Sequence, residues 1–346
     1  MIEKNKIKTY MGFVVILFVG VLFFSFKDDY KAILTALGSV NILWLILGIA
    51  FVFLSKYFIG LTTYHLAKKE NKNVSMKKMQ EIALIYPFFA GITPSSVGGE
   101  AFEVFYLKDC DISYGGASNI SMQKFILYQI ALIIVNFLVV ILNAFTHIVA
   151  DTSFVGSTIT LNFIVNIAIL GGCFLITYNR WIKNFILKNG VNILGKMRII
   201  KDPEESRKKI DDFMDSFDKG ARELHKDKRL FWELVWINIL SLIFLIIPAW
   251  PIARAMHISN ISLLNLFILA TYAKMMCLLM VTPGNSGAAE YCFIYLFTGL
   301  IEENDIMANM LIWRFVTYYI PLIVGGVIAI SWGRKKKDEK TISTES

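Results

Sequence analysis

Long apolar stretches recur along the chain, separated by shorter polar segments, and their lengths predict membrane spans. A helix needs about 20 apolar residues to cross the hydrocarbon core of a bilayer. By that measure the pattern predicts six spans, at residues 11–26, 39–61, 118–142, 159–178, 231–253 and 306–332. The first follows several lysines but ends without a small-residue cleavage site, so we interpret it as a retained anchor and not a signal peptide.

Two further apolar regions, 81–107 and 262–300, do not fit a simple span. In the first, about 12 apolar residues precede Thr93-Pro94 and about 8 follow Glu100, too few for two crossings. The second turns at residues 282–287, and its sequence leaves open whether the arm at 262–282 crosses fully. We predict that both are re-entrant hairpins. Non-helical backbone at membrane depth survives only where it is buried in protein or lines a wet cavity, so two such turns indicate a polar pathway.

Composition agrees with a membrane protein and excludes a soluble enzyme. Of the 346 residues, 56% are hydrophobic and only 18% are charged, and the mean hydropathy is +0.57, whereas soluble proteins carry about 25% charged residues. The net charge of +8 is concentrated in loops and does not indicate nucleic-acid binding.

Lysine and arginine predict the orientation, because cytoplasmic loops are enriched in them. The N-terminus, the 62–80 loop, the 180–229 loop and the 334–346 tail are basic, which predicts that both termini are cytoplasmic. Within 180–229, residues 203–225 have apolar positions at helical spacing amid charges and predict an amphipathic surface helix.

The sequence lacks the common motifs for nucleotide binding, hydrolysis and metal binding. The four cysteines show no metal-type spacing, and the sequence has no P-loop, Gly-x-Ser-x-Gly or His-Glu-x-x-His motif. We therefore expect no cofactor, no metal and no catalytic residue.

The two hairpin regions share a pattern that indicates an internal repeat. Thr93-Pro94-x-x-x-Gly98-x-Glu100 matches Thr282-Pro283-x-x-x-Gly287-x-x-Glu290, with one residue of difference before the glutamate. A cation follows each glutamate 24 residues later, and a tyrosine follows each cation by four: Lys124 with Tyr128, and Arg314 with Tyr318.

The predicted orientations of the two halves are opposite, which indicates an inverted-topology repeat of the kind that builds transporters. We therefore divide the chain into a first membrane half at 1–150, a second at 151–333 and a basic tail at 334–346. The overall expectation is an all-α polytopic membrane protein with about six full spans and two re-entrant hairpins.

Four charges inside apolar segments need an explanation, because an ionised side chain at mid-bilayer is costly unless it is paired or hydrated. They are Glu100, Lys124, Glu290 and Arg314. One interpretation is that they form structural ion pairs, with the pairing left open by the sequence. The other is that they belong to an anion site, because the helix after each turn begins with unpaired N–H groups that bind anions.

A lipid phosphate is the ligand that the second interpretation favours. Lys56 lies on the second span, from which it would face a cavity, and Lys274 precedes the second turn. The candidate substrate-binding residues are Thr93, Pro94, Ser95, Ser96, Gly98, Gly99, Glu100, Lys124, Tyr128, Lys274, Thr282, Pro283, Gly284, Asn285, Ser286, Gly287, Glu290, Arg314 and Tyr318.

The two turns, together with the segment Trp313-Arg314-Phe315-Val316-Thr317-Tyr318-Tyr319-Ile320-Pro321-Leu322, resemble the lysylphosphatidylglycerol synthase transmembrane region family. That family forms the flippase half of the bacterial multiple peptide resistance factor, an antibiotic-resistance protein. The first turn ends here in Gly-Gly-Glu, whereas the family usually has Gly-Gly-Asp, and Lys124 stands where the family has arginine.

The resemblance implies a flippase in the bacterial cytoplasmic membrane that moves an anionic, aminoacylated, polyprenyl-linked or glycolipid headgroup. The alternatives are an enzyme of the phosphatidylglycerol lysyltransferase type, or a membrane partner of a separately encoded transferase. The chain ends soon after its last predicted span, so we expect no aminoacyl-transferase domain and favour translocation of a membrane phospholipid or lipid-linked substrate.

Overall fold

The computed structural model describes residues 38, 40–91, 93, 97–179, 181, 185, 218, 219, 222, 226–277 and 287–345. The predicted first span at 11–26 and nearly all of the predicted amphipathic helix at 203–225 lie outside this part of the chain.

Five long helical segments account for the predicted spans that can be compared. They are α3 (Ile42–Glu70), α6 (Tyr114–Thr146), α7 (Ser153–Tyr178), α10 (Lys228–Ile246) with α11 (Ala249–Ala255), and α14 (Glu303–Arg314) with η3 (Phe315–Tyr319) and α15 (Ile320–Glu345). Among the described residues, these five are long and apolar enough to cross a membrane. The prediction of an all-α polytopic membrane protein is confirmed.

A polar side chain fixes the start of four of these helices. In each, a side-chain oxygen accepts a hydrogen bond from a first-turn N–H group that has no partner within the helix. The caps are Asn41 to Leu43 N (3.1 Å), Ser113 to Gly116 N (3.1 Å), Thr152 to Val155 N (3.2 Å) and Asp227 to Leu230 N (3.1 Å). Lys69 also donates to Asp227 at 2.8 Å, and this bond holds the pKa of the Asp227 carboxyl below its usual value. This exposed pair joins the end of α3 to the start of α10.

Two pairs of shorter helices occupy the regions predicted to be hairpins. In the first pair, α4 (Met76–Gly91, 16 residues) packs against α5 (Val97–Lys108, 12 residues). In the second, α12 (Leu263–Cys277, 15 residues) packs against α13 (Ala288–Phe297, 10 residues). At about 1.5 Å per residue, each helix is at most about 24 Å long, less than the roughly 30 Å of a bilayer core. Entry and exit of each pair on one side of the membrane stays a prediction, as does the inverted repeat.

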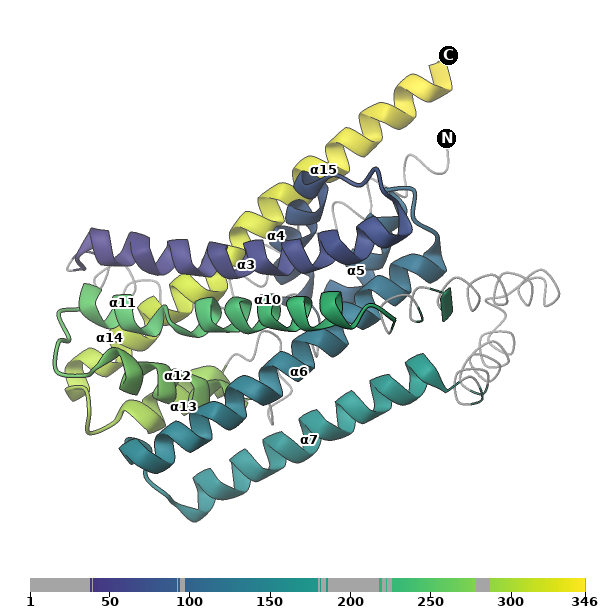
Figure 1. Ribbon diagram of the computed structural model, residues 1–346. Coiled ribbons are helices and arrows are strands. Elements are labelled where there is room, and N and C mark those ends of the chain that lie inside the picture. Colours follow the sequence, from purple (N-terminus) through teal and green to yellow (C-terminus); the bar gives the residue numbers. More distant parts are fainter. Residues whose placement is uncertain are drawn as a thin grey trace, which may run out of the picture.

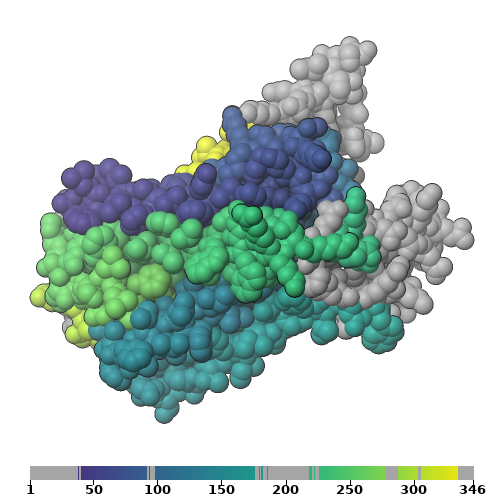
Figure 2. Space-filling model, in the orientation of Figure 1, coloured from purple at the N-terminus to yellow at the C-terminus, as the bar shows by residue number. Residues whose placement is uncertain are grey.

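The two helix pairs lie toward different ends of the long helices. Figure 1 shows α12 and α13 near the left end of the bundle and α4 and α5 toward the right. Helix α6 runs obliquely through the bundle and contacts both α5 and α12. On the face shown in Figure 2, α3, α10 and then α6 with α7 form successive bands. The bundle therefore places both short pairs against shared long helices.

The interface between α6 and α7 has amides on the inside and apolar side chains on the outside. Asn162 and Asn166 of α7 are 2% and 1% exposed, whereas Ile164 and Ile167 point outward and are 58% and 57% exposed. Membrane helices gain little from apolar contact with each other, so interhelical hydrogen bonds and close packing hold them together. The side-chain amides form three such hydrogen bonds. Gln129 donates to Asn166 (3.3 Å), Asn136 donates to Asn162 (3.4 Å), and Asn162 donates to the Met275 carbonyl of α12 (2.9 Å).

Helix α15 lies unusually close to α4 at Gly325. A Cβ atom at this position would lie 2.6 Å from the carbonyl oxygen of Leu84, closer than real Cβ atoms approach other atoms. Small residues at such crossings are typical of membrane helices because they let two backbones approach. The absence of a side chain at Gly325 thus lets α15 pack closely against α4 of the first short helix pair.

Candidate functional site

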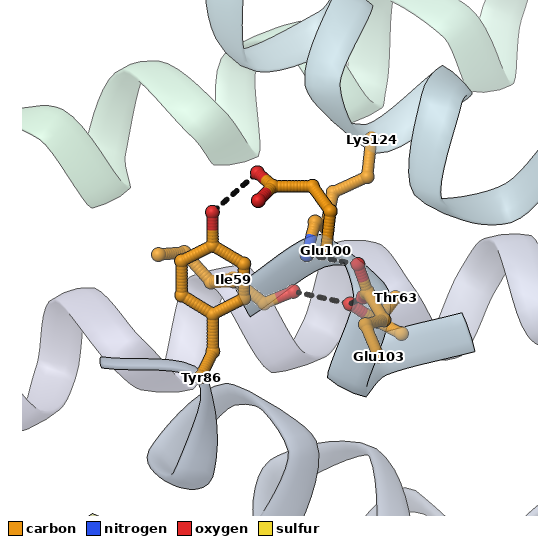
Figure 3. A network of polar contacts seen from close by, with 6 residues as sticks. All are labelled: Ile59, Thr63, Tyr86, Glu100, Glu103 and Lys124. Carbon is orange, nitrogen blue, oxygen red and sulfur yellow. Dashed lines mark hydrogen bonds and ion pairs between the residues drawn. The ribbon is translucent and has the colours of Figure 1, made fainter. Parts of the chain in front are cut away.

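The first charged centre is built where α5 crosses α3 and α6. Lys124 of α6 donates to Glu103 of α5 at 2.5 Å, and the Glu103 side chain is fully buried. The hydroxyl of Thr63 on α3 lies 3.4 Å from the second Glu103 oxygen and 3.2 Å from the Ile59 carbonyl (Figure 3). A buried carboxylate and ammonium therefore satisfy each other, as ions away from water must.

Tyr86 of α4 completes this centre. Its hydroxyl donates to Glu100 in the first turn of α5, and its ring lies 4.7 Å from the Lys124 ammonium nitrogen (Figure 3). The ring reaches this place because Gly99 has no side chain: a Cβ there would lie 2.6 Å from the Tyr86 ring. Tyr86 thus contacts both the Glu100 carboxylate and the buried Lys124 ammonium, which gains a cation–π contact.

The second charged centre joins α13 to α14. Arg314, at the end of α14 and 5% exposed, donates through Nε to Glu290 at 2.8 Å. The other Glu290 oxygen accepts from the backbone N–H of Gly287 at 2.7 Å, at the start of α13. The Tyr318 ring lies 4.5 Å from the Arg314 guanidinium carbon. Glu290 therefore caps its own helix and holds the arginine at once.

The two centres resemble each other but differ in their partners. The 24-residue spacing pairs Glu290 directly with Arg314, whereas Lys124 pairs with Glu103 and not with Glu100. Glu103 is a site residue that the sequence analysis missed. It lies three residues after Glu100, on the same helical face, so an acidic pair at this spacing on a short apolar helix was an available signal.

The aromatic contacts differ as well. Arg314 lies over Tyr318, the tyrosine four residues after it, whereas Lys124 lies over Tyr86 from another helix. Tyr128 is partly buried and packs against the core. The predicted equivalence of Tyr128 and Tyr318 does not extend to these cation–π contacts.

A π-helical segment follows Arg314 directly. Residues Phe315–Tyr319 form η3, between α14 and α15. Single turns of π-helix inside α-helices are rare and frequently mark functional sites. No sequence pattern used above predicts this segment.

A cavity of about 320 Å³ lies between the two centres. This volume is at the lower end of the roughly 300–1,000 Å³ of small-molecule sites. Tyr86 of the first centre and Arg314 of the second both line it, so one space touches both. Its wall comes from α3, α4, α10, α12, α13, α14, η3 and α15, and its lining includes Lys56, Lys274, Trp313 and Tyr318.

The two turns themselves are only partly described. Thr93 lies before α5, and its hydroxyl accepts from the Gly98 N–H at 2.9 Å. Because the Gly287 N–H is also bonded, two of the N–H groups expected to be open to an anion already have partners within the protein. The remaining predicted turn residues lie outside the described part of the chain: Pro94, Ser95, Ser96, Thr282, Pro283, Gly284, Asn285 and Ser286.

The fold and the site define a multi-pass helical membrane protein with one buried and one partly buried ion pair beside a cavity. Comparison with known proteins agrees with this class. The model of the lysylphosphatidylglycerol synthase TM region family matches residues 11–325. A UPF0104 membrane protein of Archaeoglobus fulgidus is 24% identical over 295 residues, which cover 82% of this chain and 85% of the relative. The chain belongs to the lysylphosphatidylglycerol synthase TM region family.

Proposed function

We propose that the protein translocates a lipid between the leaflets of a membrane, with the headgroup passing through the cavity between the two charged centres. The observation that carries this proposal is a cation-lined cavity inside a bundle of apolar spans. Polar and ionisable groups at membrane depth are costly and characteristically mark substrate pathways. The acyl chains would stay in the bilayer, where no such groups are required.

The ion pairs provide a way to hold and release a headgroup. An anionic headgroup entering the cavity would compete with Glu290 for Arg314, which lines the cavity. Glu290 also caps α13 through the Gly287 N–H, so a change in this pair would reach the start of that helix. We propose that exchange of Arg314 between Glu290 and the headgroup accompanies passage.

Reconstitution into liposomes tests the proposal. The purified chain is expected to speed the movement of a fluorescent phospholipid between leaflets, measured as the fraction protected from a membrane-impermeant quencher. Arg314→Gln, Glu290→Gln and Glu100→Gln should each slow transfer at least tenfold. Lys69→Gln removes an exposed cation from the Lys69–Asp227 pair, away from the cavity, and is the matched control.

Two results would contradict this function. If no anionic, aminoacylated or polyprenyl lipid moves faster with the protein than without it, the protein is not a translocator. If transfer occurs but all three site variants equal the control, the headgroup takes another path. Incubation of the same liposomes with lysyl-tRNA tests the enzyme alternative, since new lysylphosphatidylglycerol would establish a transferase.

A further inference from the structure

Three cations line the cavity, and they differ in how they are neutralised. Arg314 is bonded to Glu290. Lys56 of α3 and Lys274 of α12 form no ion pair with any carboxylate in the part of the chain that the structure describes. Lys56 and Lys274 line the same cavity, so their like charges repel each other.

Among the described residues no carboxylate lines the cavity, and the three carboxylates of the two charged centres are already engaged. Glu103 is bonded to Lys124, Glu290 to Arg314 and the Gly287 N–H, and Glu100 to the Tyr86 hydroxyl. The two centres and the cavity lining together hold these three carboxylates and four cations, because Lys56 and Lys274 add to the paired Lys124 and Arg314. One net positive charge therefore remains, and the two ammonium groups without a described carboxylate partner are on the cavity side.

Like charges brought together at membrane depth are costly, and a bound anion would relieve that cost. Lysine ammonium groups are compact point charges that bind phosphate oxygens without a fixed geometry. Other parts of the wall are apolar and include Leu245, Ile246, Ala270 and Pro321. A cavity that combines two cations with apolar lining residues fits a charged phosphate attached to a lipid.

We infer that Lys56 and Lys274 together form a subsite for the phosphate of a lipid headgroup that carries no amino group. A phosphomonoester, or a diphosphate substituted at both ends, carries up to two negative charges and matches both ammonium groups. An aminoacylated lipid brings an additional ammonium group into a space that is already positive, and is disfavoured. This inference rests on the proposed lipid site and specifies its substrate class.

Binding of defined lipids to the purified full chain tests the inference without requiring transport. Nanodiscs of phosphatidylcholine would carry phosphatidic acid, phosphatidylglycerol, phosphatidylethanolamine or lysylphosphatidylglycerol as the test lipid, and binding would be followed by thermal stabilisation and native mass spectrometry. Affinity is expected to fall in that order. Lysylphosphatidylglycerol binding more tightly than phosphatidic acid would overturn the inference.

The lysines are tested by charge removal and charge conservation. Lys56→Gln and Lys274→Gln should each weaken phosphatidic acid binding about tenfold, which corresponds to about 1.4 kcal/mol, while phosphatidylethanolamine binding changes less than twofold. Lys56→Arg, which keeps the positive charge, should keep the preference for phosphatidic acid over phosphatidylethanolamine. Lys69→Gln, at an exposed position, should not alter that preference. An unchanged order of affinities in the double Gln variant, shown to be folded by its elution profile, would refute the role of both lysines.

A soluble phosphate is separated from a lipid by competition. Glycerol phosphate and inorganic phosphate, added in solution, should stabilise the protein far less than phosphatidic acid at equal concentration. Equal stabilisation by the soluble anions would contradict a lipid ligand. If phosphatidic acid binds as expected but is not moved between leaflets, translocation fails while the headgroup assignment stands.

Discussion

Replacement of Glu103 by glutamine tests the charge pairing at the first centre. The side chains of Glu103 and Lys124 are 0% and 11% exposed, and their charged atoms are 2.5 Å apart. Removing one partner of a buried ion pair costs about 3–5 kcal/mol, because the other charge stays buried without compensation. Lys124 keeps its contact with the Tyr86 ring, worth roughly 0.5–2 kcal/mol, so we expect a loss near the lower end, about 3 kcal/mol.

The matched comparison is Glu100→Gln. Glu100 is only partly buried and is bonded to a neutral tyrosine hydroxyl, so its loss leaves no buried cation unpaired. We expect about 1 kcal/mol, typical of one hydrogen bond. The free energy of unfolding is measured by equilibrium denaturation in mixed micelles, for each variant and for each combined with Lys124→Gln.

The double-mutant cycle assigns the pair. Glu103→Gln and Lys124→Gln should show a coupling energy of at least about 1.5 kcal/mol, within the range for residues in direct contact. Glu100→Gln and Lys124→Gln should couple more weakly. A cost for Glu100→Gln equal to or above that for Glu103→Gln, with the stronger coupling, would show that Lys124 pairs with Glu100 and would refute the reasoning.

Two further predictions concern close contacts at glycines. Gly325→Ala should lower the thermal stability of the protein, because the new Cβ meets the Leu84 carbonyl at 2.6 Å, whereas Gly171→Ala on α7, with nothing within 4 Å, should be neutral or slightly stabilising; equal melting temperatures would contradict the close approach of α15 to α4. Gly99→Ala should displace the Tyr86 ring and slow lipid transfer several-fold without loss of the folded protein, and transfer equal to that of the unchanged chain would show that the ring position is not required.

The spans were predictable because the length of each apolar stretch can be read directly from the sequence. The stretch predicted at 118–142 lies within α6, and the one at 39–61 lies mostly within α3. Helix α3 continues to Glu70, past Lys68 and Lys69, because hydropathy measures the part of a helix that matches lipid and not the helix itself.

The site was only partly predictable. A charged residue within an apolar stretch indicates that the residue belongs to a site, but it does not indicate which residue pairs with it. The four intramembrane charges identified from the sequence all lie at the two centres. Their partners depend on how the helices pack: α5 against α6 brings Glu103 within reach of Lys124, and α4 against α5 brings Tyr86 within reach of Glu100. No spacing rule along the chain predicts how these helices pack.

The π-helical segment after Arg314 sets the register of one long helix. An α-helix advances about 100° per residue, since it has 3.6 residues per turn, and a π turn accommodates one residue more. The same continuous helix therefore directs Arg314 toward α13 on one side of Phe315–Tyr319 and Gly325 toward α4 on the other. Conversion of this turn to α geometry would rotate one end against the other by about 100°. The ion pair at Glu290 and the close contact at Leu84 therefore both depend on the geometry of this one π turn.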